Sequence, residues 1–497
     1  MFVTHPVLSR RRAGILLHPT SLPASASEAG RELLGTLGSE AYRFVDFLQA
    51  AKIGVWQVLP LGPTLDDLSP YMSTSVHAGN PNLISLDLLR EWGWLDDESL
   101  PDHASRQVRL DAAYEGFVAR ASEHEWQELR DFCERHRAWL DDYATYEALR
   151  HDFQRAPWFQ WPQALRDRDS QALAEVGERL QPCVEQVCFE QFVFFRQWLA
   201  LKRYANARDI DLFGDMPIFV SHDSAEVWAH REYFDLNDDG QPITIAGVPP
   251  DYFSDTGQRW GNPHYCWDRM AEDGYLWWIK RMRTALELFD LVRIDHFRGF
   301  EAFWSIRGDA ETAIDGHWVA GPGNALFKAL QAAFPYLPVV AEDLGVITPE
   351  VEALRECWNF PGMKILQFAF DGGPENPYLP HNHRKNAVVY TGTHDNDTTP
   401  GWVQQLSDDS KHYICDYLGC NAASLPWGLI RAAMASTARL AVVPLQDFLG
   451  LDSEARMNVP GEPEGNWRWR FSWDQVPVDL NSRVEHLVRL YGRAPRG

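Results

Sequence analysis

Eight short apolar runs recur along the chain, and each ends just before polar side chains or, once, before a proline. Runs of this kind are typical of buried parallel strands, and the segments between many of them have helical periodicity. Eight strands that each deliver polar groups at their carboxyl ends predict a (β/α)8 TIM barrel, with a doubly wound sheet as the alternative. The runs are Gly14–Leu17, Val55–Leu59, Leu212–Phe213, Leu291–Ile294, Val339–Ala341, Met363–Phe370, Ala387–Tyr390 and Leu440–Leu445.

The length of the chain requires large insertions into such a barrel. A (β/α)8 barrel takes about 250 residues, whereas this chain has 497 residues. We expect a single catalytic barrel domain over 1–497, with a helical insertion at about 95–205 and a substrate-covering loop insertion at about 221–275. The first insertion carries apolar residues at three- to four-residue steps, and the second is rich in Pro, Gly, Asp and aromatic residues.

Charge and composition exclude several classes of partner. The net charge is 46 − 70 = −24, so nucleic acid and anionic membranes are poor partners. The amino-terminal segment lacks the apolar core of a signal peptide, and no apolar run is long enough to span a bilayer, which predicts a cytoplasmic protein. The seven cysteines include no CxxC pair, which favours free thiols over a disulfide framework or a zinc ribbon.

The strand that ends in LVRIDHFRG carries the first candidate for chemistry. Arg293 and Asp295 are two residues apart and therefore point to the same side of the strand, with His296 just beyond. An arginine beside an aspartate favours the ionised carboxylate, which a nucleophilic carboxylate requires. A structural ion pair at the end of a strand is the alternative.

Two further strand ends carry acidic residues. Alternation sends Glu342 and Asp343 of VVAEDLG to opposite sides of their strand, and a carboxyl group next to apolar walls can hold a proton and act as a general acid. His394 and Asp395 follow the strand in VVYTGTHDND. A helix cap and a turn are the respective alternatives.

Taken together, the three strand ends indicate chemistry on glycosides. Retaining enzymes place two carboxyl groups about 5–5.5 Å apart, one to attack the anomeric carbon and one to protonate the leaving oxygen. The chain has no HExxH or comparable pair of metal ligands and no Gly-rich phosphate loop, so we expect neither a metal nor a cofactor.

Long motifs spread over nearly the whole chain resemble the amylomaltases, the 4-α-glucanotransferases of glycoside hydrolase family 77. They are HPTSLP at 18–23, WQVLPLGPT at 56–64, SPY at 69–71, AGNP at 78–81, GDMPIFV at 214–220, GVPPDYFSDTGQRWGNP at 247–263, RIDHFRG at 293–299, AEDLG at 341–345, NPYLPHN at 376–382, YTGTHDNDT at 390–398 and NVPGEPEGNWRWR at 458–470.

The resemblance implies a (β/α)8 barrel that acts on malto-oligosaccharides and other α-1,4-glucans by a retaining double displacement. It implies that Asp295 is the nucleophile, Glu342 the acid/base and Asp395 the stabiliser of the transition state. Arg293 resembles the arginine that keeps the nucleophile charged. The resemblance also implies contacts with the substrate by His394, His296, Asp215, Tyr71, Tyr252, Phe253 and Trp260, the last three from the loop that covers the acceptor channel.

Departures from the family pattern cluster around Tyr71. The segment from Leu65 to Leu68 stands where the family usually has a Gly-rich stretch, Met72 where Gln is commoner, and Asn82 where Tyr is usual. These differences predict an altered fit for the donor rather than a different reaction. A retaining α-amylase-like hydrolase and a non-catalytic α-glucan-binding protein are the alternative functions, although intact Asp295, Glu342 and Asp395 argue against the second.

Overall fold

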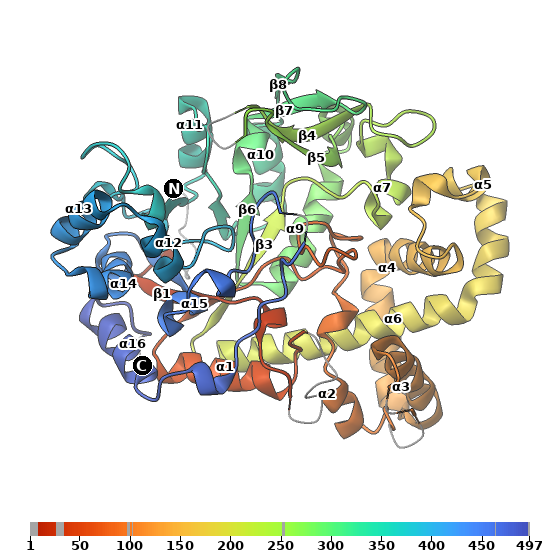
Figure 1. Ribbon diagram of the computed structural model, residues 1–497. Coiled ribbons are helices and arrows are strands. Elements are labelled where there is room, and N and C mark those ends of the chain that lie inside the picture. The colour runs from red at the N-terminus through yellow and green to blue at the C-terminus, as the bar shows by residue number, and fades with distance from the viewer. Residues whose placement is uncertain are drawn as a thin grey trace.

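An eight-stranded parallel sheet forms the centre of the molecule, and it confirms the predicted (β/α)8 barrel (Figure 1). The computed structural model describes residues 8–25, 34–96, 100–101, 103–250, 254–462 and 464–495. Each predicted apolar run contains or overlaps one strand of the sheet. In sheet order the strands are β10 (Gly362–Ile365), β11 (Ala387–Tyr390), β12 (Leu440–Pro444), β1 (Arg12–Leu16), β2 (Val55–Gln57), β3 (Asp211–Pro217), β6 (Leu291–Asp295) and β9 (Val339–Ala341).

Alternation along the strands decides which side chains enter the barrel. In β6, Leu291 belongs to the apolar cluster inside the barrel, whereas Val292 and Ile294 pack in the larger cluster between strands and helices. Arg293 and Asp295 share the side of Leu291, because residues two apart on a strand face the same way. By the same rule Glu342 follows the inward-facing Val340 of β9. The sequence pattern thus aims these polar side chains at the carboxyl end of the barrel interior.

The barrel closes between β9 and β10 with few hydrogen bonds. The Ala341 N–H donates to the Pro361 carbonyl at 2.9 Å. The Met363 N–H donates to the Asp343 carboxylate at 2.7 Å, so a side chain replaces a strand carbonyl as acceptor. Asp343 also pairs with Arg355 at 3.2 Å, outside the barrel. The side chains of the neighbouring residues Glu342 and Asp343 therefore point to opposite faces of the sheet, as strand alternation predicts.

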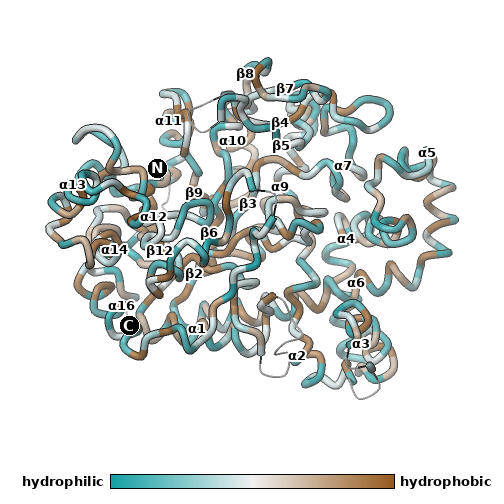
Figure 2. Tube along the Cα trace, viewed as in Figure 1, coloured by the Kyte–Doolittle hydropathy of each residue, from teal (hydrophilic) through white to brown (hydrophobic). Residues whose placement is uncertain are grey.

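Sixteen α-helices surround and extend the barrel in the described part of the chain, and one group, α3 to α6, stands to one side of it (Figure 1). Along α6 apolar and polar residues alternate, as in a helix with one packed face (Figure 2). The helices are α1 (Ser39–Ala50), α2 (Leu86–Glu91), α3 (Arg106–Arg120), α4 (Glu123–Asp152), α5 (Gln163–Arg166), α6 (Ser170–Asn206), α7 (Ala225–Ala229), α8 (Trp267–Glu272), α9 (Leu276–Leu288), α10 (Asn324–Ala333), α11 (Pro349–Cys357), α12 (Thr399–Gln405), α13 (Asp408–Leu418), α14 (Leu425–Ala435), α15 (Leu445–Leu449) and α16 (Leu480–Leu490).

Two buried glutamines tie α6 to the loop that follows β2. The Gln191 side chain accepts from the Gly79 N–H at 2.8 Å and donates to the Gly79 carbonyl at 2.9 Å. Gln197 brackets the backbone of Ser85 in the same way, at 2.7 and 3.1 Å. Both glutamines are fully buried. Each side chain therefore satisfies two backbone groups that have no access to water.

We expect Gln191→Met to lower the free energy of unfolding by about 2–4 kcal/mol, because it leaves the Gly79 N–H and carbonyl unpaired in the interior. Thermal and urea unfolding of the variant measure the loss. Gln181→Met is the matched control, since Gln181 lies on the exposed side of the same helix and bonds only Glu185. Equal midpoints for the two variants would show that the buried bracket contributes little.

A second, antiparallel sheet lies above the barrel, and the sequence reasoning did not anticipate it (Figure 1). Its strands, in sheet order, are β5 (Gln258–Pro263), β4 (Thr244–Val248), β7 (Ala302–Arg307) and β8 (His317–Ala320). A half-buried strand is expected to alternate apolar and polar residues, but the β5 sequence QRWGNP has few apolar residues, so the alternation cannot be seen in it.

In the described part of the chain no helix combines the length and the apolar character that crossing a membrane requires.

Candidate active site

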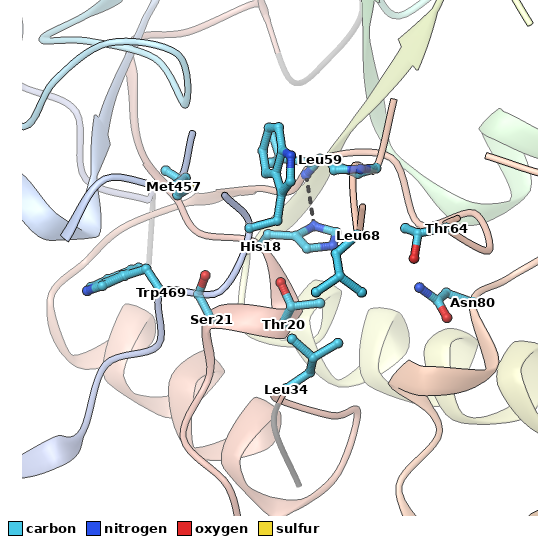
Figure 3. Close-up of a pocket in the computed structure, with 12 residues that line it drawn as sticks. His18, Thr20, Ser21, Leu34, Leu59, Thr64, Leu68, Asn80, Met457 and Trp469 are labelled. Atoms are coloured by element: carbon cyan, nitrogen blue, oxygen red, sulfur yellow. Dashed lines mark hydrogen bonds between the residues drawn. The ribbon is translucent and has the colours of Figure 1, made fainter. Parts of the chain in front are cut away.

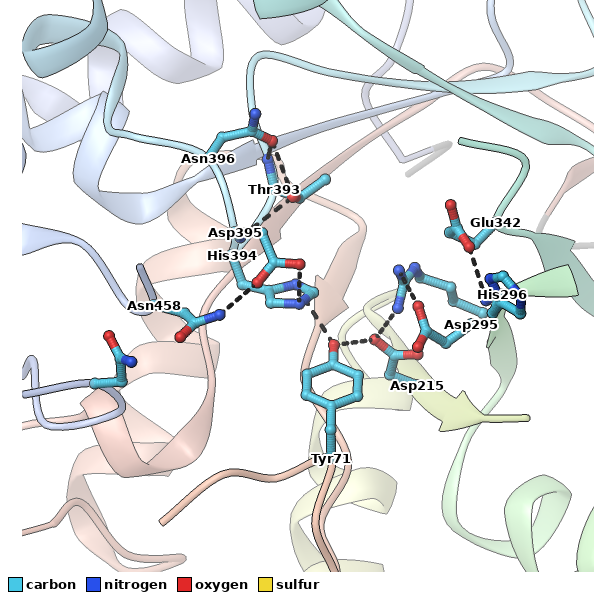
Figure 4. A network of polar contacts seen from close by, with 12 residues as sticks. Tyr71, Asp215, Asp295, His296, Glu342, Thr393, His394, Asp395, Asn396 and Asn458 are labelled. Carbon is cyan, nitrogen blue, oxygen red and sulfur yellow. Dashed lines mark hydrogen bonds and ion pairs between the residues drawn. The ribbon is translucent and has the colours of Figure 1, made fainter. Parts of the chain in front are cut away.

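An arginine between two carboxylates forms the centre of the site (Figure 4). Arg293 donates from Nη1 to Asp215 Oδ2 and from Nη2 to Asp295 Oδ1, both at 2.6 Å. The strand register places Asp215 of β3 beside Arg293 of β6. The Asp215 side chain is 0% exposed and the Asp295 side chain 30% exposed. Asp295 is thus the carboxylate of this pair that faces the open space of the site.

Glu342 stands next to this cluster with both of its oxygens hydrogen-bonded. Oε2 accepts from the His296 N–H at 2.7 Å and Oε1 from the Leu344 N–H at 2.8 Å. The His296 backbone is left-handed, with φ of 52°, and this unusual conformation accompanies the turn of its N–H towards Glu342. Burial, aided by the negative charge of Asp295, raises the pKa of Glu342 to about 8. Glu342 is therefore a carboxyl group that holds its proton at neutral pH.

Asp395 faces these groups from the opposite side of the site (Figure 4). Its Oδ2 lies 3.3 Å from His394 Nε2, and its side chain is 49% exposed. Although burial acts against it, His394 and a hydrogen bond from Asn458 hold the pKa of Asp395 below its usual range. The surroundings thus shift the pKa values of Glu342 and Asp395 in opposite directions, because desolvation dominates at Glu342 and the neighbouring His394 and Asn458 dominate at Asp395.

Tyr71 connects the two sides. Its hydroxyl group donates to Asp215 Oδ2 at 2.8 Å and lies 3.5 Å from His394 Nδ1, while its ring stacks on the imidazole with 5.0 Å between centroids. The tyrosine comes from the loop after β2, which Gln191 anchors. The loop, two barrel strands and the segment after β11 thus converge on one network (Figure 4).

Aromatic groups form a wall beside Glu342. The Trp260 ring of β5 meets the His296 imidazole edge-on at 4.9 Å, and Phe219 lies 6.4 Å from Trp260. Burial lowers the pKa of His296 to about 4, so its imidazole is neutral. Tyr252 and Phe253, predicted for the same loop, lie outside the described residues. Strand β5 of the second sheet therefore brings Trp260, which the motif at 247–263 marks in the sequence, to the edge of the site.

A small pocket lies next to the segment that precedes Tyr71 in the chain, since Leu68 and Pro70 line it (Figure 3). Its volume of about 20 Å³ gives room for about one water molecule, and Leu68, Trp467 and His18 contribute to its lining. His18 accepts from the Leu59 N–H at 3.3 Å, and burial lowers its pKa to about 3. Leu68 adopts φ of 63°, a conformation that favours glycine. In the segment from Leu65 to Leu68, which departs from the family pattern, Leu68 therefore adopts a backbone conformation that is unfavourable for a residue other than glycine.

Residues from the carboxyl-terminal loop were missed by the sequence reasoning. Asn458 donates to Asp395 Oδ1 at 2.7 Å, and Arg456 donates to the Asp395 carbonyl at 2.9 Å. Trp467 packs 6.0 Å from Tyr71 and 5.9 Å from His394. The motif at 458–470 marks this segment in the sequence, but it follows no strand end. Only the fold brings it to the site.

A (β/α)8 barrel with four carboxyl groups and an arginine converging at the carboxyl ends of its strands belongs to the class of enzymes that act on glycosidic bonds. The family model for 4-α-glucanotransferases matches residues 17–475. The chain is 50% identical to the 4-α-glucanotransferase of Thermus thermophilus, over 97% of this chain and 98% of that protein. It is 48% identical to the 4-α-glucanotransferase of Synechocystis sp., over 98% and 99% of the respective chains.

A solved structure gives the same result in three dimensions. An amylomaltase from Streptococcus agalactiae, determined in complex with acarbose, superposes with a TM-score of 0.93 at 36% identity, covering 98% of this chain and 100% of that one. The chain belongs to the 4-α-glucanotransferase family, glycoside hydrolase family 77. It is an enzyme with 4-α-glucanotransferase activity, which confirms the function that the motifs predict.

Proposed function

We propose that the enzyme moves segments of α-1,4-glucan between malto-oligosaccharides by a retaining double displacement in which Asp295 is the nucleophile, Glu342 the acid/base and Asp395 the stabiliser of the transition state. The observation that carries this proposal is the contrast between Asp295, paired with Arg293, and Glu342, whose pKa is raised to about 8 beside it. A carboxylate held by an arginine suits the nucleophile, and a neighbouring carboxyl group that keeps its proton suits the acid.

In the first step an Asp295 oxygen attacks the anomeric carbon of the donor. The bond to the glycosidic oxygen breaks, and Glu342 gives that oxygen its proton, so the departing sugar leaves as a neutral alcohol. In the second step an acceptor hydroxyl attacks the same carbon while Glu342 takes its proton, and Asp295 is released. Two inversions at one carbon give net retention.

The remaining side chains take the roles that their places support. Arg293 neutralises one charge between Asp215 and Asp295, and Tyr71 and His394 bind the sugar at the reacting centre. Asp215, which the resemblance places among the sugar contacts, has a side chain with 0% exposure and acts instead by holding Arg293 and the Tyr71 hydroxyl group. Asp395 carries negative charge towards the positive charge that develops on the ring. His296 and Trp260 form the acceptor side, to which Tyr252 and Phe253 also contribute.

The whole chain acts as one catalytic domain with two insertions. This proposal is supported by the barrel strands, which lie from Arg12 to Pro444, and by the family model, which matches residues 17–475. The helical insertion supports the Tyr71 loop through Gln191 and Gln197. The second insertion supplies the acceptor wall through β5.

We expect incubation with maltotriose alone to give glucose and maltopentaose in equal amounts at first, followed by longer chains. A sugar acceptor held in place can outcompete water, because oriented binding is worth effective molarities of about 10⁵ M or more. Resolution of the products by chain length makes the measurement, with Asp295→Asn as the blank. Glucose and maltose with nothing longer would mean that water is the acceptor and that the enzyme is an α-amylase-like hydrolase.

A further inference from the structure

Asp395 differs from Asp295 and Glu342, the other two carboxyl groups proposed to be catalytic, in how it is held. Asp295 is fixed by Arg293 and Glu342 by two backbone N–H groups. Asp395 lies after β11 in a turn, and its side chain is 49% exposed. A half-exposed aspartate can rotate its carboxylate unless neighbours hold both oxygens. In this site His394 faces Oδ2, and the Asn458 amide donates to Oδ1.

We propose that Asn458 is a positioning residue for the transferase reaction, which holds the Asp395 carboxylate in its working orientation without neutralising it. The inference rests on the role proposed above for Asp395. A carboxylate that stabilises positive charge on the sugar has to keep its own negative charge. A lysine or arginine at the place of Asn458 would fix the carboxylate and cancel that charge, whereas a neutral amide fixes it through a hydrogen bond alone.

The loop that carries Asn458 is closed on itself and anchored independently. The Trp467 N–H donates to the Met457 carbonyl at 2.7 Å, and the Val459 N–H donates to Asn466 Oδ1 at 2.8 Å. Arg456 bonds the Asp395 carbonyl at 2.9 Å and the Asn458 carbonyl at 3.2 Å. These contacts remain when the Asn458 side chain is shortened. The backbone of the loop is therefore held in place, and from it the Asn458 amide donates to the Asp395 carboxylate (Figure 4).

The groups that face Asp395 define how its titration responds. They are His394, Asn458 and Tyr71, with Arg293 further across the site, and Arg456, which donates to the Asp395 backbone carbonyl. Loss of the Asn458 donor withdraws a hydrogen bond from the charged form only. The Asp395 carboxylate then becomes easier to protonate, so the acidic limb of the activity profile moves to higher pH.

The test compares Asn458→Ala and the isosteric Asn458→Asp with the unchanged enzyme on maltotriose. We expect Asn458→Ala to lower kcat about 10- to 100-fold, the range for a hydrogen bond to a charged group, with a much smaller change in KM. The acidic limb should move up in pH. Asn458→Asp should be worse, because it replaces the donor with a like charge. Asn386→Ala is the control, since it removes an exposed amide contact before the amino end of β11.

A second readout separates this inference from the role of Asp395 itself. Calorimetry with a protonated iminosugar, a cationic glucose mimic, measures binding in the unchanged enzyme, Asn458→Ala, Asp395→Asn and the double variant. We expect the Asn458→Ala loss to vanish once Asp395 is already asparagine. A loss of the same size in that background would overturn the inference, as would an Asn458→Ala enzyme with unchanged kcat and pH profile. Full activity and binding in Asp395→Asn would instead overturn the proposed role of Asp395.

Discussion

Asp295→Asn is expected to lower the rate of glucan transfer by at least about 10⁴-fold, the scale on which loss of a covalent nucleophile acts. The amide is uncharged and cannot form the glycosyl ester, so the first displacement has no nucleophile. The fold and the affinity for glucan should remain, because asparagine has the shape of aspartate and its oxygen can still accept from Arg293 Nη2. Product analysis with maltotriose measures the rate, and calorimetry measures binding.

Asp309→Asn is the matched control for this substitution. Asp309 is exposed and pairs with Arg307 at the end of β7, away from the candidate site, so its replacement should leave transfer unchanged. Mass spectrometry after addition of an α-glucosyl fluoride gives a direct readout in the Glu342→Gln background, because the second step is blocked there and an enzyme with a working nucleophile keeps the mass of one glucosyl group. Turnover within tenfold of normal in Asp295→Asn would end the assignment.

Glu342→Gln is expected to reduce kcat/KM on maltotriose by about 10²–10⁴-fold and to affect α-glucosyl fluoride far less. Fluoride leaves without a proton, so the first step no longer needs the general acid. The glycosyl-enzyme should accumulate, because glutamine cannot take the proton of the acceptor in the second step. Glu352→Gln, on the exposed side of α11, is the control. Equal losses on both donors would show that Glu342 is not the acid.

The same group sets an expected pH dependence. The pKa of Glu342 is raised from 4.5 to about 8, so the acid form is lost and kcat/KM on maltotriose falls as pH rises through about 8. That basic limb should be absent with glucosyl fluoride. Between about pH 4.5 and 8 the folded enzyme holds a proton that the unfolded chain has released, so stability decreases as pH rises. Glu342→Gln should weaken this decrease in the thermal midpoint.

Much of the barrel could be predicted from the sequence because its strands are buried on both faces. A buried parallel strand is a continuous apolar run, and all eight such runs belong to the sheet. The second sheet gave no comparable signal. β5 carries Gln258, Arg259 and Asn262, and its pairing with β4 shifts register between Ile245 and Gly247. An antiparallel strand that is half exposed and irregular is hard to distinguish from a loop.

The residues of the site likewise differ in how well the sequence predicts their positions. Arg293, Asp295 and Glu342 could be placed from the sequence, because strand alternation fixes the side to which each residue points. Tyr71, Trp260 and Asn458 reach the site from loops or from the second sheet, and their positions depend on contacts across long stretches of chain. The resemblance to a family named Tyr71 and Trp260. Asn458 was visible only once the carboxyl-terminal loop had a place beside Asp395.

The seam between β9 and β10 bears on how an alignment of this family has to be interpreted. Glu342 and Asp343 are adjacent acidic residues, yet Glu342 lies beside Asp295 in the candidate site, whereas Asp343 replaces a strand carbonyl for Met363 and leaves no space for a side chain at Gly362. Selection on catalysis would preserve the first column and selection on assembly of the barrel the second. Conservation at either of these two adjacent positions would therefore not by itself identify a catalytic residue, because the proposed chemistry constrains Glu342 and the closure of the barrel constrains Asp343.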